Sequence, residues 1–441
     1  MPKTSILIST SLVLILWAVT TPGRAAEPAA ALEARVAAME AELKELKGEL
    51  AQLRAAQTPS PAAAESPPAA VSAADGEHGS ASAAGSAAPA LSWSSYGELN
   101  YTRPAADPSQ ARADLARLVL GFGYRFDERT RLQAEVEIEH AVSSSGDPGE
   151  VAIEQAYIEH DLGAEVRARL GLFLMPSGLL NENHEPTRYY GVFRNAVETA
   201  IIPSTWREGG IALQGTHANG WRWDAGIGTS FDLSKWDAAS ADGIESPLGS
   251  IHQELAQARA ASLAGFVAAN YTGITGLRLG ASLFSGGAGQ GQAGSSGNRL
   301  SLWETHARWQ PGAWDFAALY ARGHLSNTAA LNQSLAGIPT PDSPTLIPQD
   351  FFGWYAEAAW RARVGRAWPL VPFLRYERFN TASSYAMLGA APAPQPLADR
   401  EALTAGVQAQ IAPGVIVKAD YVDFAHGRDG DRFDLGLGYE F

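Results

Sequence analysis

The densest group of side chains able to do chemistry lies in residues 182–198. The group contains Glu182, His184, Glu185, Arg188, Tyr189, Tyr190, Arg194 and Glu198. An imidazole between carboxylates is a set of ligands that a metal ion accepts. A guanidinium group stays charged and offers a planar fork of donors, so the arginines could instead replace part of the hydration shell of an anion.

Motifs for metal, nucleotide or acyl chemistry are weak in this chain. ENHE at 182–185 lacks the H-E-x-x-H spacing, and GQGQAG at 289–294 is followed by a Ser- and Gly-rich stretch rather than a helix. No G-x-S-x-G motif occurs, and the absence of cysteine excludes thiolate ligands and a cysteine nucleophile. We therefore expect no enzyme, no metal and no other cofactor, and we interpret residues 182–185 as part of a solvated loop. A hydrolase whose Ser, His and acidic side chain meet only in the folded chain is the alternative.

Composition restricts the partners. Charged residues make up 18% of the 441 residues, and the formal net charge is -14. Nucleic-acid binding requires a basic footprint, so we expect no nucleic-acid partner. The length fits two or three soluble domains or one large barrel.

The elements that must position residues 182–198 follow from the hydrophobic periodicity. In the final stretch DRFDLGLGYEF, Phe433, Leu435 and Leu437 share one parity, and Asp434 lies on the other. A period of two is typical of a β-strand with unlike faces. The pattern continues from Leu91 to the end of the chain and predicts sixteen strands. They are expected near 91–101, 112–126, 129–142, 150–162, 165–174, 207–217, 219–232, 260–272, 276–285, 298–310, 312–324, 350–363, 367–379, 400–411, 414–425 and 431–441.

The connections between these strands alternate in length. Those after even-numbered strands take a few residues, as in FDER, LGA, HAN and QPG, whereas most of the others are longer. A soluble β-sandwich is not expected to alternate short and long connections in this way. An outer-membrane barrel is, because it has short periplasmic turns, long external loops and an even number of strands. We therefore predict an all-β fold, a 16-stranded antiparallel transmembrane β-barrel at 91–441, surrounded by outer-membrane lipid.

Side chains of the inward parity would line the lumen of this barrel. The predicted basic wall residues are Arg117, Arg125, Arg167, Arg169, Arg222 and Lys418. Acidic residues such as Glu135, Glu137 and Asp224 share that parity, so the wall is mixed. The third long connection spans residues 175–206, and a structureless loop of about 30 residues is uncommon and usually functional. We predict that it narrows the pore with Arg188, Arg194, Glu185, His184 and Tyr189.

The first ninety residues have sequence patterns other than the period of two that begins at Leu91. Residues 1–25 combine an early lysine, an apolar run and small residues, the pattern of a secretory signal peptide. Residues 26–57 carry a heptad repeat, which predicts an oligomerising coiled-coil α-helix. Its apolar positions are Leu32, Val36, Met39, Leu43, Leu46, Leu50 and Leu53. Residues 58–90 are rich in Pro, Ala and Ser and have too few large apolar side chains to fold, so we expect a disordered linker.

Together these features resemble the phosphate-selective porin O and P family. The most similar stretch is EQAYIEHDLGAEVRARLGLFLMPSGLLNENHEPTRYYGVFRN, in which an Arg-bearing strand leads through GLFLMPSG into the third loop. The resemblance implies an outer-membrane diffusion channel for small hydrophilic solutes, with anions such as phosphate preferred. It also implies that the third external loop folds inward and narrows the pore.

The same resemblance implies partners and a location. It implies a homotrimer in the outer membrane of a Gram-negative bacterium, with the coiled coil in the periplasm. The final Phe441 looks like the sorting signal read by the barrel-assembly machinery. Dicarboxylate-type porins also carry an N-terminal coiled coil, so a dicarboxylate or general-solute porin without phosphate selectivity is an open alternative. Another is a closed barrel that tethers the membrane to cell-wall material.

Overall fold

The computed structural model describes the barrel region of the chain and little that precedes it. The described residues are 41, 44, 90–144, 146, 148–292, 297–340, 343–361, 369–389, 392–425 and 430–441. The predicted signal peptide, coiled coil and linker therefore lie outside the described residues, apart from Ala41, Lys44 and Ala90. Within the described part of the chain, no helix combines the length and the apolar character needed to cross a membrane.

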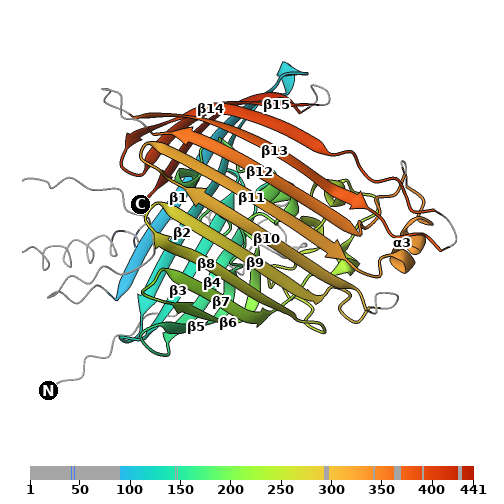
Figure 1. Ribbon diagram of the computed structural model, residues 1–441, viewed down its shortest axis with the longest axis horizontal. Helices are drawn as coiled ribbons and strands as arrows, with labels where there is room; N and C mark the ends of the chain where they lie inside the picture. Colours follow the sequence, from blue (N-terminus) through green and yellow to red (C-terminus); the bar gives the residue numbers. More distant parts are fainter. Residues whose placement is uncertain are drawn as a thin grey trace, which may run out of the picture. The chain divides into compact units, whose positions relative to one another are not determined.

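Sixteen strands form one closed antiparallel barrel among the described residues (Figure 1). They are β1 (Leu91–Pro104), β2 (Arg112–Arg125), β3 (Thr130–Glu139), β4 (Val151–Asp161), β5 (Val166–Leu174), β6 (Arg207–Thr216), β7 (Trp221–Gly228), β8 (Ala264–Ile274), β9 (Leu277–Gly287), β10 (Arg299–Trp309), β11 (Trp314–Leu325), β12 (Asp350–Trp360), β13 (Leu370–Ser384), β14 (Arg400–Ala412), β15 (Val415–Phe424) and β16 (Arg432–Glu440). Each strand pairs with its neighbours in sequence, and β1 pairs with β16 to close the barrel. Each predicted range overlaps one of these strands, so the predicted 16-stranded antiparallel barrel is confirmed.

Short helices occupy several of the long connections. They are η2 (Pro108–Gln110), η3 (Pro186–Arg188), η4 (Val197–Ile201), η5 (Leu233–Lys235), α2 (Asp242–Glu245), η6 (Gly249–Ile251) and α3 (Ala329–Leu335). The β5–β6 connection, residues 175–206, contains η3 and η4 and is called loop 3 below. Figure 1 shows α3 at one end of the barrel and the C-terminus at the other. The chain therefore ends on the side of the short turns.

The alternation of side chains determines which face of each strand meets lipid. In β16, Phe433 is 40% exposed and Leu435 and Leu437 are similar, whereas Asp434 is fully buried. Asp434 accepts a hydrogen bond from Arg432 Nε (2.8 Å) on the inner side. The exposed face also carries Trp93, Trp221, Trp303, Trp309, Trp314 and Trp360. An apolar outer surface with aromatic side chains is the surface that a transmembrane barrel presents to lipid.

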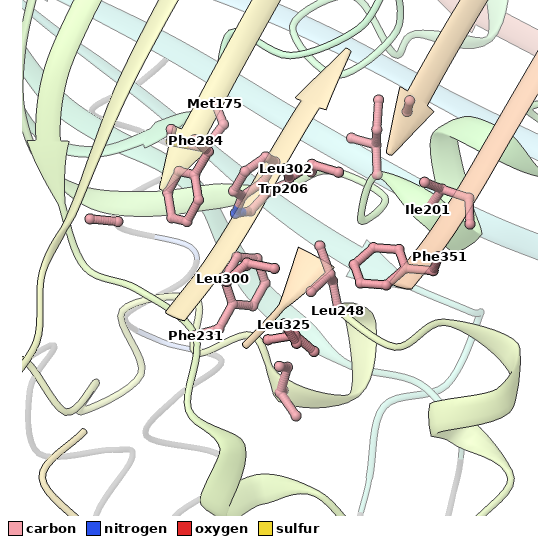
Figure 2. Packing of buried hydrophobic residues seen from close by; sticks show 14 of the residues in the cluster. Met175, Ile201, Trp206, Phe231, Leu248, Phe284, Leu300, Leu302, Leu325 and Phe351 are labelled. Atoms are coloured by element: carbon pink, nitrogen blue, oxygen red, sulfur yellow. The ribbon is translucent and has the colours of Figure 1, made fainter. Parts of the chain in front are cut away.

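Part of the lumen is filled by an apolar core (Figure 2). Trp206 of loop 3 packs on Phe231 of the β7–β8 connection, with ring centroids 5.5 Å apart, and both contact Phe284 of β9. The core continues along the inner faces of β10, β11 and β12 with Leu300, Leu302, Leu325 and Phe351. Each such side chain contributes roughly 1.5–3 kcal/mol when it is fully buried, so the core fixes both loops against one side of the wall.

We expect Phe441→Asp to reduce the amount of folded barrel in the outer membrane. Phe441 is 79% exposed, and its backbone exchanges two hydrogen bonds with Ser95 of β1, which the substitution leaves intact. An acidic residue near the membrane boundary costs at most about 1 kcal/mol, so a larger loss would come from the terminal aromatic side chain acting as a sorting signal. Heat-modifiable protein in outer-membrane fractions measures the effect.

Phe126→Asp is the matched control, because Phe126 is an exposed aromatic residue in a short turn and not at the chain end. It should assemble almost normally. Normal levels of the Phe441→Asp protein, or equal losses in both variants, would contradict a role for the terminal position.

Candidate functional site

Loop 3 enters the lumen and crosses it. The Tyr189 hydroxyl donates to Glu98 Oε2 on β1 (2.8 Å), and the Tyr190 hydroxyl donates to Asp315 Oδ2 on β11 (2.7 Å). Close to β7, Glu182 accepts a hydrogen bond from Arg222 (2.7 Å). A loop that contacts strands so far apart around a closed barrel must lie inside it. The predicted inward course of this loop is therefore confirmed.

The first half of loop 3 reaches the end of the barrel at which the chain terminates. The Thr187 hydroxyl donates to Glu440 Oε2 (2.5 Å), and Arg188 Nη2 lies 3.4 Å from the same oxygen. Glu440 is the last residue of β16, whereas loop 3 starts and ends at the opposite rim. The loop therefore runs through much of the barrel's height as well as across its width.

The second half of loop 3 is held by apolar packing and by one buried carboxylate. Val197 and Ile201 of η4 lie against Gly353 of β12, where a Cβ would come within 3.0–3.1 Å of their side-chain carbons. Glycine permits this close approach. Glu198 accepts hydrogen bonds from the backbone N–H of Leu180 (2.7 Å) and from the Tyr355 hydroxyl (2.9 Å) on β12. The Tyr355 bond and the packing on Gly353 fix η4 to β12, whereas the Leu180 bond joins the two halves of loop 3.

Four of the predicted site residues meet in one buried cluster. Arg117 Nε donates to Glu98 Oε1 (2.8 Å), and Arg117 Nη2 donates to the backbone carbonyl of His184 (3.2 Å). Lys418 Nζ donates to the backbone carbonyl of Tyr189 (2.8 Å) and lies 3.7 Å from the centroid of its ring. Burial and the Glu98 carboxylate raise the pKa of Tyr189, which keeps its hydroxyl a donor. The cluster fastens loop 3 to β1, β2 and β15.

His184 and Tyr189 are therefore buried, with exposed fractions of 3% and 5%. The sequence predicted a solvated loop at this point, and this expectation is wrong. The physical reason is that the wall supplies carboxylates and hydroxyls that replace water as hydrogen-bond partners.

The predicted wall arginines of β5 and β7 are paired with carboxylates. Arg167 and Arg169 lie 3.3 Å and 2.9 Å from the carboxylate of Glu159 on β4. Arg169 and Arg222 also lie 3.5 Å and 2.7 Å from Glu182 of loop 3. Although burial opposes the charge, these two guanidinium groups hold the pKa of Glu182 below its ordinary value. Positive charge on this part of the wall is therefore neutralised locally.

Three further predicted residues, Glu185, Arg188 and Arg125, lie outside the cluster around Arg117. Arg188 pairs with Glu185 (3.6 Å), and both belong to loop 3. Arg125 is exposed at the last residue of β2. The structure does not bring these residues into the Arg117 cluster.

Arg194 has different surroundings from the other loop 3 cations. Its Nη1 donates to the hydroxyls of Ser204 (2.6 Å) and Thr205 (3.1 Å). Among the residues that the structure describes, it forms no ion pair with a carboxylate, and its Nη2 has no hydrogen-bond partner. Arg194 therefore contributes a positive charge without a carboxylate partner in this part of the chain, although its Nη2 is buried.

Sequence reasoning missed three wall residues that hold loop 3: Tyr96, Glu98 and Glu154. Tyr96 and Glu98 share the inward parity of β1, so the alternation itself could have identified them. Glu154 could not be found in this way, because a bulge interrupts the register. Glu135 pairs with Gln155 and Val136 with Ile153, which leaves Glu154 unpaired in the ladder.

The closed barrel and the inward loop define the class of fold, a 16-stranded porin-like β-barrel. The chain belongs to the same family as an uncharacterized protein of Aquifex aeolicus (strain VF5), to which it is 30% identical over 355 residues, 78% of this chain and 79% of that protein. No protein-family model matches the sequence.

Solved porin structures are similar to the barrel. OmpF of Salmonella typhi, in complex with daunomycin, is 14% identical with a TM-score of 0.54, over 80% of this chain and 97% of that one. The outer membrane channel DcaP of Acinetobacter baumannii is 12% identical with a TM-score of 0.49, over 80% and 97%. An anion-selective porin from Comamonas acidovorans is 14% identical with a TM-score of 0.48, over 80% and 99%. The likeness to OmpF shows a shared fold.

We expect Glu182→Gln to destabilise the protein in a pH-dependent way. Because the folded-state pKa of Glu182 is lowered, its contribution is fully present above the unfolded pKa of about 4.3 and is lost as the pH falls through the folded value. The substitution should cost about 1–3 kcal/mol at pH 7 and much less at pH 3, as measured by denaturant unfolding.

Glu128→Gln provides the control, since Glu128 is an exposed carboxylate in a short turn. It should change the free energy of unfolding little at either pH. A cost of Glu182→Gln that is the same at pH 3 and pH 7 would show that the carboxylate charge does not hold the loop.

Proposed function

We propose that this chain is an outer-membrane diffusion channel for small hydrophilic solutes, with small anions such as phosphate preferred and loop 3 as the constriction. The observation that carries the proposal is Arg194, a cation on the loop that crosses the lumen, without a carboxylate partner among the described residues. A fixed charge acts more strongly in a narrow passage with little water than on an exposed surface. An anion that loses hydration there gains guanidinium donors, and weak binding still permits release.

In this proposal the other predicted site residues position the constriction. His184 and Tyr189 hold loop 3 through Arg117 and Lys418, and Arg188 and Glu185 hold it near the end of β16. The apolar core occupies the inner faces of β8 to β12 near the loops, so we place the route for solutes beside the other strands, whose inner faces carry charged side chains.

A dicarboxylate or general-solute channel without phosphate selectivity is the second candidate. The pairing of the wall cations favours it: Arg117, Arg169 and Arg222 each contact a carboxylate. In the described part of the chain, these residues therefore form no row of uncompensated positive charge.

Substituting Arg194 separates the two candidates. Arg194→Gln should lower the anion-to-cation permeability ratio by roughly twofold to fivefold, the equivalent of about 0.4–1 kcal/mol for one partly solvated charge. Arg194→Lys keeps the charge and should keep most of the preference. The measurement is the reversal potential in planar bilayers under a salt gradient, with phosphate and a dicarboxylate as competing anions.

Arg299→Gln is the control, because Arg299 is an exposed arginine of β10 whose neighbour Leu300 faces the core. It should leave the reversal potential unchanged. A ratio that Arg194→Gln does not alter, with phosphate and dicarboxylate competing equally, would favour the general-solute channel. A complete lack of conductance in the native protein would overturn the channel itself.

We also propose that residues 1–25 direct export, that residues 26–57 form a periplasmic coiled coil and that residues 58–90 link it to the barrel. The heptad repeat supports self-association, and the resemblance to porins that associate in threes leads us to propose a homotrimer. Deleting residues 32–53 should therefore weaken the trimer and leave a folded barrel, because the barrel has its own closed ladder of hydrogen bonds. Native mass in mild detergent tests this, and a monomeric mass for the complete chain would contradict it.

A further inference from the structure

His184 meets two carboxylates of the wall beneath loop 3. Ligand atoms of Glu135 on β3, Glu154 on β4 and His184 all lie within 4.8 Å of one another. His184 Nε2 is 3.5 Å from Glu154 Oε1, and both residues are buried. One imidazole and two carboxylates from three separate segments therefore converge in a place with little water.

The two ring nitrogens of His184 face different partners, Nδ1 the backbone of loop 3 and Nε2 the side chains of the wall. Its Nδ1 lies 3.0 Å from the backbone carbonyl of Asn181, which can only accept, so Nδ1 carries a proton. In the neutral ring, Nε2 then carries the lone pair; it lies 2.5 Å from the Tyr96 hydroxyl, a contact that a bound metal ion would replace. A metal-binding histidine usually donates its other N–H to a carbonyl or carboxylate in this way.

Glu154 is directed into the cluster by a backbone irregularity. It is the residue left unpaired by the bulge between β3 and β4, and bulges of this kind re-aim side chains at functional sites. Its Oε2 accepts from the Tyr96 hydroxyl (2.8 Å), but Oε1 is buried without a hydrogen-bond partner. A buried carboxylate oxygen in this state costs about 1–3 kcal/mol or more unless a further ligand satisfies it.

The local charge balance also favours a bound cation. Glu98 and Glu137 lie 2.8 Å and 3.9 Å from the same guanidinium, that of Arg117. Glu135 accepts from the Gln155 amide (2.7 Å), and among the described residues no Lys or Arg pairs with Glu135 or Glu154. The two carboxylates therefore lack a cationic side chain of their own.

We propose that Glu135, Glu154 and His184 form a binding site for a divalent transition-metal ion, with Zn²⁺ as its probe, that fixes loop 3 to β3 and β4. Zinc holds nitrogen and oxygen ligands at about 2.0–2.2 Å, which places tetrahedral ligands roughly 3.4 Å from each other. The 3.5 Å between His184 and Glu154 already matches this spacing, and small side-chain rotations bring Glu135 into place. The imidazole favours a transition metal over Ca²⁺ or Mg²⁺. Only the histidine of this site belongs to the ENHE motif. Both carboxylates come from wall strands and not from the two glutamates of the motif.

Zinc binding to the full chain tests the proposal. The protein is purified from outer membranes, stripped with a chelator, titrated with Zn²⁺, desalted and analysed for metal content. We expect one zinc ion per chain at this site and no competition from Ca²⁺. Glu135→Gln and Glu154→Gln keep the side-chain shape and should each weaken binding by at least about tenfold.

His306→Ala is the matched control. His306 is another buried histidine next to a glutamate, with Nδ1 2.8 Å from Glu304 and Nε2 3.1 Å from Asn270, but among the described residues it belongs to no group of three potential metal ligands. This variant should bind zinc like the native protein. The melting temperature is a second readout: zinc should raise it in the native protein and in His306→Ala, and not in Glu135→Gln.

The alternative is a protonated His184 that forms a plain ion pair with Glu154. In that case zinc would shift the melting temperature of none of these proteins. Fewer than about 0.1 zinc ions per chain, or equal zinc affinity in the native protein and Glu135→Gln, would likewise overturn the proposed site.

Discussion

Carboxylates on the inner wall accept hydrogen bonds from loop 3, and this requirement decides where the loop can run. A backbone N–H that is buried in the lumen must find an acceptor there. Asp420 on β15 accepts from the N–H of Val192 (2.6 Å), and Glu377 on β13 accepts from that of Ala196 (2.9 Å). The acidic residues of the wall thus act as fixed partners for a polar chain segment, and much of their charge is used in this way.

Hairpin register explains why so much of the wall charge is paired. Glu159 and Arg169 face each other directly across the β4–β5 ladder, and Glu98 faces Arg117 across β1 and β2. Cross-strand neighbours of opposite charge attract, and their fields largely cancel at a distance. A count of inward arginines therefore overstates the positive potential that a solute meets. Arg194 differs from these wall cations, because it lies in loop 3 and no strand register places a carboxylate opposite it.

The strands could be predicted from the sequence because each one carries its own period of two, and the hairpin pairs follow from short turns. Contacts made by long connections could not. Strand β13 has charges on both faces, and the outward Arg378 is explained by Asp399, which precedes β14. The burial of His184 depends on Tyr96 and Glu154, which lie far from it in sequence, and on a bulge that breaks the alternation. The hydrophobic period describes the side chains of one strand at a time. These contacts join distant segments and form only in the closed barrel.

The contacts of loop 3 on either side of the β1–β16 junction also bear on how the barrel is assembled. Tyr189 binds Glu98 of β1, while Thr187 binds Glu440 of β16. The loop therefore bridges the first and the last strand, the two edges that meet only when the sheet closes. Docking of the loop and joining of these edges stabilise each other, so a chain with a displaced loop loses part of the free energy that drives closure. The segment proposed as the constriction thus also contributes to the stability of the closed barrel.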